Sequence, residues 1–85
     1  MSVVGSLQSS LDVRSMAVTN DFLYLGSKFG TIEVWLRDRL MKVGTLHTRG
    51  GNSKLISLAV HGDGEFLFSA SVDGRIEVHI TIQLL

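Results

Sequence analysis

Apolar and polar side chains alternate in short runs along the whole chain, as they do in β-strands. The runs are rich in β-branched and aromatic residues, and pairs such as Asn-Asp, Gly-Gly and Asp-Gly separate them. No stretch shows the 3.6-residue period of an amphipathic helix, and the chain has no proline. The pattern predicts strands at Val13–Val18, Phe22–Ser27, Thr31–Trp35, Met41–Leu46, Leu55–Val60, Glu65–Ser71 and Arg75–Ile80, with residues 3–8 as a candidate further strand.

The second half of the chain repeats the first. Residues 22–35 align with residues 66–79 at a constant offset of 44, and Phe, Leu, Ser, Gly, Ile, Glu and Val recur at the same places. Upstream, residues 15–18 match residues 57–60 at an offset of 42, and the difference falls in the turn between them and the next strand. Insertions confined to turns are expected when one supersecondary unit is repeated. We therefore interpret the chain as two copies of one β unit.

A period of about 40–45 residues with four strands per unit is typical of WD-repeat β-propellers. Residues 56–78 resemble strands a, b and c of one blade, residues 13–35 resemble the same strands of another, and residues 41–46 resemble an outer strand d. The resemblance implies an all-β fold: an incomplete β-propeller of about two four-stranded antiparallel blades, the second lacking a full outer strand. The expected parts are an N-terminal segment at 1–11, a candidate outer strand of a preceding blade; a first blade at 12–48; a loop at 49–54; and a partial second blade at 55–85.

In WD repeats a His, a Ser or Thr, an Asp and a Trp form a hydrogen-bonded support inside each blade. The resemblance assigns structural WD-repeat positions to Ser27, Gly30, Trp35, Ser71, Asp73, Gly74 and His79. Both copies depart from the pattern, since Phe29 replaces the turn Asp of the first and His79 replaces the Trp of the second. His47 is a candidate for the loop histidine. We expect apolar packing to hold these blades more than the polar support.

A closer resemblance is to the last propeller blades of plant Lin-type (Cerberus-like) ubiquitin ligases. It rests on residues 13–18 (VRSMAV), 21–25 (DFLYL), 32–37 (IEVWLR) and 42–44 (KVG). Those ligases carry an upstream U-box, which recruits the ubiquitin-conjugating enzyme, and a WD-repeat part that binds partners. The U-box pattern is not found in these 85 residues. The resemblance therefore implies a protein–protein interaction scaffold, a non-catalytic piece of a larger ligase, and predicts that the chain is not an enzyme.

Composition narrows the partners that we expect. Eight basic and eight acidic residues leave no net charge, without the basic surplus of a nucleic-acid-binding protein. No apolar run approaches the roughly 18 residues of a membrane helix. The chain has no cysteine and no sign of a secretory signal. We predict protein partners, neither nucleic acid nor membrane, no cofactor and no metal, and a location inside the cell, in the cytoplasm or the nucleus.

Candidate chemistry is sparse. The three histidines, the serines and Asp63 or Asp73 show no nucleophile-elbow motif and no spacing that forces them together, so no catalytic residue is predicted and a hydrolase ranks last. His61 and Asp63 supply too few ligands for a structural zinc site. The loop at 49–54 is the best candidate for partner contact, through Arg49, Asn52 and Lys54, because irregular loops on rigid β scaffolds often carry recognition.

Two blades expose apolar sheet faces and open edges, and repeat arrays generally need about three or more units. The tail at 81–85 is too short for a turn and a full strand d. We therefore expect the remaining propeller blades, or self-association, to cover the exposed faces. The alternative is a small β structural protein that stands alone or is completed by oligomerisation.

Overall fold

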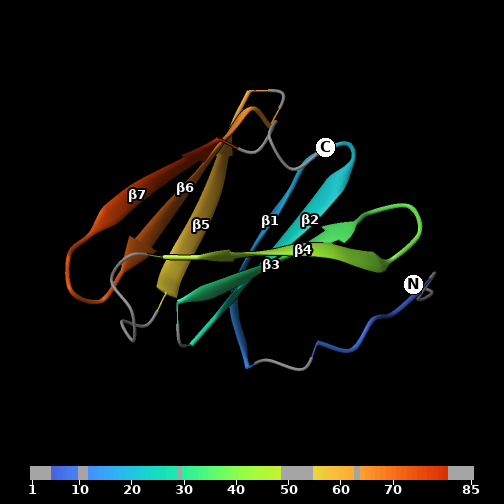
Figure 1. Cartoon of the computed structure of the whole chain (residues 1–85), viewed down its shortest axis with the longest axis horizontal. Helices are drawn as coiled ribbons and strands as arrows, with labels where there is room; N and C mark the ends of the chain where they lie inside the picture. Colours follow the sequence, from blue (N-terminus) through green and yellow to red (C-terminus); the bar gives the residue numbers. More distant parts are fainter. Residues whose placement is uncertain (1–4, 10–11, 29, 49–54, 63, 81–85) are drawn as a thin grey trace, which may run out of the picture.

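The computed structural model describes residues 5–9, 12–28, 30–48, 55–62 and 64–80, with Ile56 described by its backbone alone. These residues form two antiparallel sheets and no helix (Figure 1). The strands are β1 (Val13–Val18), β2 (Phe22–Ser27), β3 (Thr31–Leu36), β4 (Met41–His47), β5 (Leu55–His61), β6 (Phe66–Ser71) and β7 (Ile76–Ile80). The first sheet has the order β1-β2-β3-β4 and the second the order β5-β6-β7. The prediction of an all-β chain is confirmed.

The two sheets share local details as well as strand order. In each, a β-bulge interrupts the pairing of the first two strands, between Val13 and Ser15 in one and between Leu55 and Ser57 in the other. In each, the turn between the second and third strands contains a glycine with positive φ, 81° at residue 30 and 85° at residue 74. Side chains with a Cβ adopt that conformation only at a cost, so glycine fits both turns. The repeat in sequence is thus a repeat in structure.

Each sheet has two faces, which we name by their equivalence in the repeat. The strand registers place alternate residues on opposite faces. The front of the first sheet carries Ala17, Phe22, Tyr24, Ile32 and Val34, and the same positions on the front of the second are Ala59, Phe66, Phe68, Ile76 and Val78. The back of the first sheet carries Met16, Val18, Leu23, Leu25, Glu33 and Trp35, and the same positions on the back of the second are Leu58, Val60, Leu67, Ser69, Glu77 and His79.

The core forms where the front of the first sheet packs on the back of the second. Its buried side chains are Ala17, Phe22, Tyr24, Ile32, Val34, Leu55, Leu58 and Leu67, with Leu36, Leu46 and Val60 packed around them. The strands that meet across it are β1 and β2 on one side and β5 on the other (Figure 1). Gly26 permits the close approach, because a Cβ there would lie 3.1 Å from Cδ1 of Leu58. Two equivalent sheets therefore stack front to back.

Candidate interaction faces

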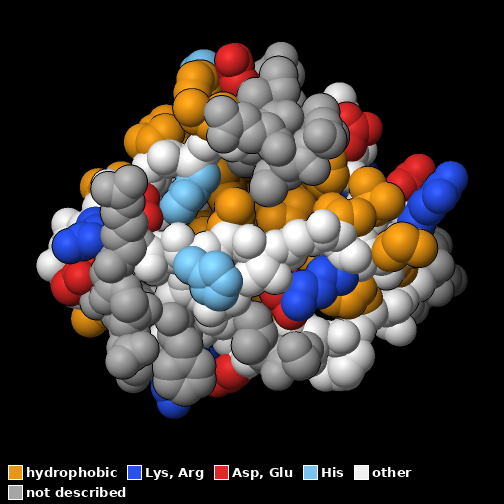
Figure 2. Space-filling view, viewed as in Figure 1, with side chains coloured by type: hydrophobic (Ala, Val, Ile, Leu, Met, Phe, Trp, Pro, Cys, Tyr) orange, Lys and Arg blue, Asp and Glu red, His pale blue; other side chains and the backbone are white. Residues whose placement is uncertain are grey.

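The front of the second sheet is exposed, although the same face of the first sheet is buried. Ile76 and Val78 are 71% and 54% exposed, whereas Ile32 and Val34, their copies, are fully buried. Phe68, next to Val78 across the strand pair, is 37% exposed. Hydrophobic side chains reach the surface beside β7 in Figure 2. Adjacent exposed apolar side chains of this kind make the face a candidate site of association.

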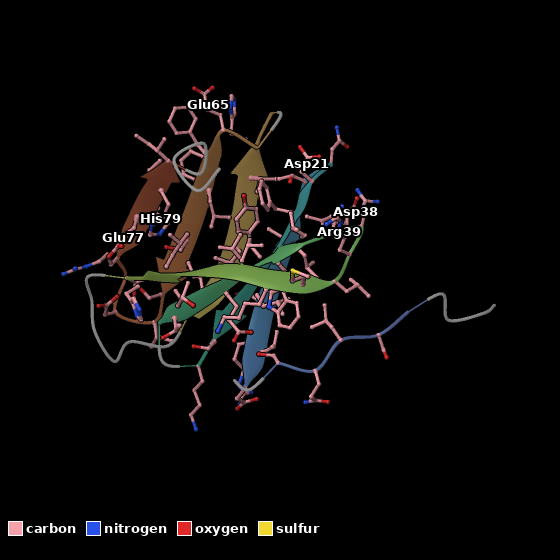
Figure 3. The ribbon with its side chains drawn as sticks, turned by 45° about the vertical axis from the view of Figure 1, so that its right-hand side comes forward. Asp21, Asp38, Arg39, Glu65, Glu77 and His79 are labelled. Atoms are coloured by element: carbon pink, nitrogen blue, oxygen red, sulfur yellow. The ribbon has the colours of Figure 1, made fainter. Side chains whose placement is uncertain are left out.

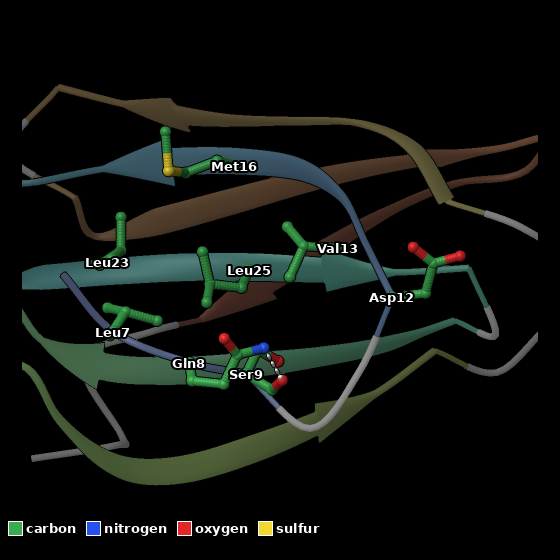
Figure 4. A pocket seen from close by; sticks show the side chains of 8 residues that line it. All are labelled: Leu7, Gln8, Ser9, Asp12, Val13, Met16, Leu23 and Leu25. Atoms are coloured by element: carbon green, nitrogen blue, oxygen red, sulfur yellow. Dashed lines mark hydrogen bonds between the residues drawn. The ribbon is translucent and has the colours of Figure 1, made fainter.

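The back of the first sheet is open along β1. It holds a groove of about 400 Å³, shown in Figure 4, lined by Leu7, Gln8, Ser9, Asp12, Val13, Met16, Leu23 and Leu25. One wall of the groove is the segment at residues 5–9, which lies in neither sheet. Met16 and Val18 are 60% and 43% exposed on β1. Their copies on the second sheet, Leu58 and Val60, pack in the core.

Glu33 is a buried carboxylate on the back of β3, only 1% exposed. The Ser9 hydroxyl donates to its Oε1 at 2.6 Å, and the indole N–H of Trp35 donates to the same oxygen at 3.2 Å. Nζ of Lys42, on β4, lies 3.2 Å from Oε2. Burial raises the pKa of Glu33, but these hydrogen bonds and the charge of Lys42 outweigh burial and hold the pKa below its ordinary value. This Glu33 cluster fastens the segment at residues 5–9 to the back of the first sheet.

Glu77 is the copy of Glu33 in the second sheet, and its neighbours differ. Its side chain is 16% exposed and lies 3.7 Å from Nη1 of Arg75 and 3.9 Å from Nε2 of His79. Figure 3 shows Glu77 and His79 side by side on β7. Burial lowers the pKa of His79, and the negative charge of Glu77 offsets part of that shift. An open groove of about 450 Å³ lies here, lined by His47, Arg75, Ile76, Glu77, Val78 and His79.

Ser69 and His79 form a hydroxyl–imidazole pair, with Oγ 3.1 Å from Nε2. Its geometry does not match a catalytic triad. In a triad the carboxylate binds the ring nitrogen that the serine does not use, whereas Glu77 also approaches Nε2. Ser69 is only 3% exposed, so a substrate has little access to its hydroxyl. The Ser69–His79 pair acts as a packing contact on the back of the second sheet. The other histidine of this sheet, His61, lies apart from the pair at the exposed end of β5.

The turn between β6 and β7 brings three predicted WD-repeat positions together. Oγ of Ser71 lies 3.0 Å from Oδ1 of Asp73, and the same Oδ1 accepts the N–H of Arg75 at 3.1 Å. The N–H of Gly74 donates to the carbonyl of Ser71 at 3.0 Å. The side chain of Asp73 therefore closes the turn onto strand β6.

The other predicted positions lie on the same elements with different contacts. Ser27 is buried, and its Oγ accepts the N–H of Thr31 at 3.1 Å, just after Gly30. Trp35 donates to Glu33, and His79 lies beside Ser69. Three of the residues considered above, Arg49, Asn52 and Lys54, lie outside the described residues, as do Phe29 and Asp63.

The Glu33 cluster escaped prediction from sequence. Two of its members come from elements outside the repeated hairpin, namely Ser9 and Lys42. One signal was available: a glutamate recurs between Ile and Val at both residue 33 and residue 77. A carboxylate kept inside two apolar strands indicates a polar partner nearby.

Comparison with known proteins adds to this picture. No protein-family model matches the chain. Over 76 residues, 89% of its length, the chain is 51% identical to "Putative E3 ubiquitin-protein ligase LIN" of Medicago truncatula. It is 47% identical over 76 residues to "Putative E3 ubiquitin-protein ligase LIN-2" of Lotus japonicus. This chain is similar to proteins named as E3 ubiquitin ligases. It spans about 5% of the length of these curated relatives.

These relatives contradict the prediction that the chain is not an enzyme, because an E3 ubiquitin-protein ligase is an enzyme. The prediction relied on motifs within 85 residues, whereas the relatives carry their name for a far longer chain. The expected resemblance to Lin-type ligases agrees with the names of these relatives. In the described part of the chain there is no helix with the length and apolarity needed to cross a membrane.

Proposed function

We propose that this chain is a WD-repeat-type β module, part of a larger E3 ubiquitin ligase, and that it binds other proteins for that ligase. The observation that carries the proposal is the front-to-back stacking of two equivalent sheets, the way in which blades follow one another in a propeller. The similarity to ligases of the LIN name supports the biological context. An incomplete propeller of about two blades is the proposed architecture.

The proposal gives roles to the predicted residues. Ser27, Gly30, Trp35, Ser71, Asp73, Gly74 and His79 hold the turn before the third strand of each sheet and that strand itself. The loop that carries Arg49, Asn52 and Lys54 contacts the partner. That partner is a protein rather than a nucleic acid or a membrane, and the module works in the cytoplasm or the nucleus. Propeller scaffolds bind through loops on a rim while their sheets stay rigid, and residues 49–54 lie between the two sheets in sequence.

The experiment uses the full-length Medicago truncatula relative and the same protein without the stretch that matches this chain. Two readouts separate catalysis from recognition: ubiquitin discharge from a charged conjugating enzyme onto free lysine, and the set of proteins ubiquitinated in a Medicago truncatula cell extract. We expect discharge onto lysine to persist and a subset of extract proteins to lose modification. Loss of discharge, or an unchanged set of modified proteins, would contradict the proposal.

A competition assay tests the loop. Added in excess, the 85-residue chain should reduce ubiquitination of the same subset by occupying the partner. The double variant Arg49→Ala/Lys54→Ala should compete more weakly. Arg37→Ala/Arg39→Ala removes two exposed cations from the turn between β3 and β4 and serves as the matched control. Equal competition by both variants would count against the loop as the contact.

A further inference from the structure

We infer that copies of this chain associate head to tail, with the front of the second sheet of one copy packed on the back of the first sheet of the next. The inference goes beyond the proposed ligase function and does not depend on it. It starts from the contact within the chain, where the front of the first sheet covers the back of the second. Each half of that contact has a copy elsewhere on the molecule: the copy of the front is exposed, and the copy of the back is exposed along β1.

The uncovered front repeats the covered front closely. Four of seven front positions keep the same residue in both sheets: Ala17 and Ala59, Phe22 and Phe66, Ile32 and Ile76, and Val34 and Val78. The other three exchange one small or apolar residue for another: Tyr24 for Phe68, Gly26 for Ala70 and Leu36 for Ile80. Ala70 carries the Cβ that Gly26 lacks in the close contact within the chain. A surface that fits the back of the second sheet is thus presented again, without a cover.

The back of the first sheet exposes β1, the strand equivalent to the one through which the back of the second sheet makes the contact within the chain. Within the chain, β5 is the strand of the second sheet that meets β1 and β2. The strand equivalent to β5 is β1, and its back-facing residues Met16 and Val18 are the exposed ones. The segment at residues 5–9 lies over the groove beside them, and β1 keeps its own edge of the back open. The next copy has an apolar strand to pack on.

Charge does not oppose this contact. The seven front positions of the second sheet compared above are all apolar. On the back of the first sheet, the carboxylate of Glu33 is already paired with Lys42, and Asp12 at the end of the groove is paired with Arg14 at 2.8 Å. Association therefore buries apolar surface without burying an unpaired charge, which is the costly alternative.

The contact joins two different faces, so it is heterologous. Such contacts close into rings when the rotation between copies allows it, and otherwise continue as open filaments. Propellers close with about four to eight sheets. A chain that presents two sheets would close with about two to four copies. A second copy of this chain is the occupant that both faces fit.

The test measures mass by light scattering and sedimentation over a wide concentration range. Val78→Lys places a charge on the front, and Met16→Lys places one on the back; both positions are exposed within one chain. Each variant should weaken association at least about tenfold, since a lone charge would be buried at the contact. Val72→Lys, at a 63% exposed position in the turn between β6 and β7, is the matched control and should associate like the natural chain.

Mixing the two face variants decides the direction of the contact. Val78→Lys keeps an intact back and Met16→Lys keeps an intact front, so an equal mixture should form a one-to-one pair that grows no further. Ile76→Lys, at a 71% exposed position, replaces Val78→Lys in the same mixture if circular dichroism shows that the latter is unfolded. Three results would overturn the inference. The natural chain stays monomeric, the Met16→Lys variant forms pairs in the absence of Val78→Lys, or the mixture of the two variants stays monomeric.

Discussion

The two sheets carry a glutamate at the same position and surround it differently. Glu33 is 1% exposed and receives contacts from three separate elements: Trp35 on its own strand, Lys42 on β4, and Ser9 in the segment at residues 5–9. Glu77 is 16% exposed, and two titratable residues near it, Arg75 and His79, belong to β7 or the turn before it. A fourth strand and a crossing segment are therefore what allow this repeat unit to bury a carboxylate.

The front faces of the two sheets also carry many of the same residues and differ in burial. Ile32 and Ile76 are the same residue at the same repeat position, and one is fully buried while the other is 71% exposed. The first three strands of the two sheets share their order and register, so the difference comes from what surrounds them: the second sheet covers the front of the first, and β4 pairs with β3, whereas β7 is the last strand of its sheet in the described part of the chain. Side-chain identity alone does not set the burial of a repeat position; the sheet opposite it and the strand beside it also do.

The largest expected effect separates this isoleucine pair. Ile32→Ala removes three carbons from the core and should lower the free energy of unfolding by about 3 kcal/mol, because a cavity remains where the side chain packed. Ile76→Ala should change it by less than about 0.5 kcal/mol in the monomer, since the side chain is mostly in water. Urea unfolding at low protein concentration measures both. Equal losses would mean that the two fronts are equally covered.

A smaller effect separates the glutamate pair. Glu33→Gln keeps the shape but removes the charge that Lys42 faces, and should cost about 1–2 kcal/mol of unfolding free energy because the carboxylate is buried. Glu77→Gln should cost less than about 0.5 kcal/mol, since its ionic contacts are long and reach solvent. Urea midpoints give the comparison. A larger decrease in unfolding free energy for Glu77→Gln than for Glu33→Gln would show that the contribution of the carboxylate to stability does not depend on the fourth strand.

The smallest effect is a dependence on pH. Burial lowers the pKa of His79 below its ordinary value of 6.5, so the unfolded chain binds this proton more readily than the folded chain. Stability due to the neutral ring is complete above pH 6.5 and is lost as the pH falls toward the lowered value. Glu33 behaves alike at lower pH, since its pKa lies below the ordinary 4.5. His79→Gln should flatten the decline that begins near pH 6.5, by a fraction of about 1 kcal/mol, in urea midpoints taken at each pH.

A second variant checks the sign of that prediction. The charge of Glu77 raises the pKa of His79 and so limits the shift that burial causes. Glu77→Gln removes this charge, which lowers the pKa of His79 further and should steepen the loss of stability below pH 6.5. A flatter profile in Glu77→Gln would show that the acid-sensitive group is not this histidine.

Most of the fold could be predicted from the sequence, because its determinants are local. Alternation along each strand and the glycines at residues 30 and 74 placed the seven strands to within one residue at each end. The candidate further strand at residues 3–8 was wrong where the structure describes it, since residues 5–8 form no strand. The repeat implied that both halves adopt one shape, and the shared bulges agree. Local patterns of this kind reflect only the backbone and its nearest neighbours.

The site depended on long-range packing and could not be predicted in the same way. The hydrogen bond from Ser9 to Glu33 spans 24 positions, and no periodicity along the chain indicates it. The sequence did not indicate which sheet face is covered either, since Ile32 and Ile76 both precede Glu-Val at the same repeat position and are opposite in burial. Contacts of this kind depend on how separate elements meet in space.

Front-to-back stacking gives any array built from this unit a direction, with two unlike ends. One end of the array exposes the front face of a sheet and the other end exposes the back face of a sheet. A capping element that covers the front face therefore does not fit the back face. Here the back end carries the segment at residues 5–9, held by the Ser9–Glu33 hydrogen bond, as a partial lid. Engineering a soluble, terminated version of this protein would therefore require two different caps, one of which the chain has already begun to supply.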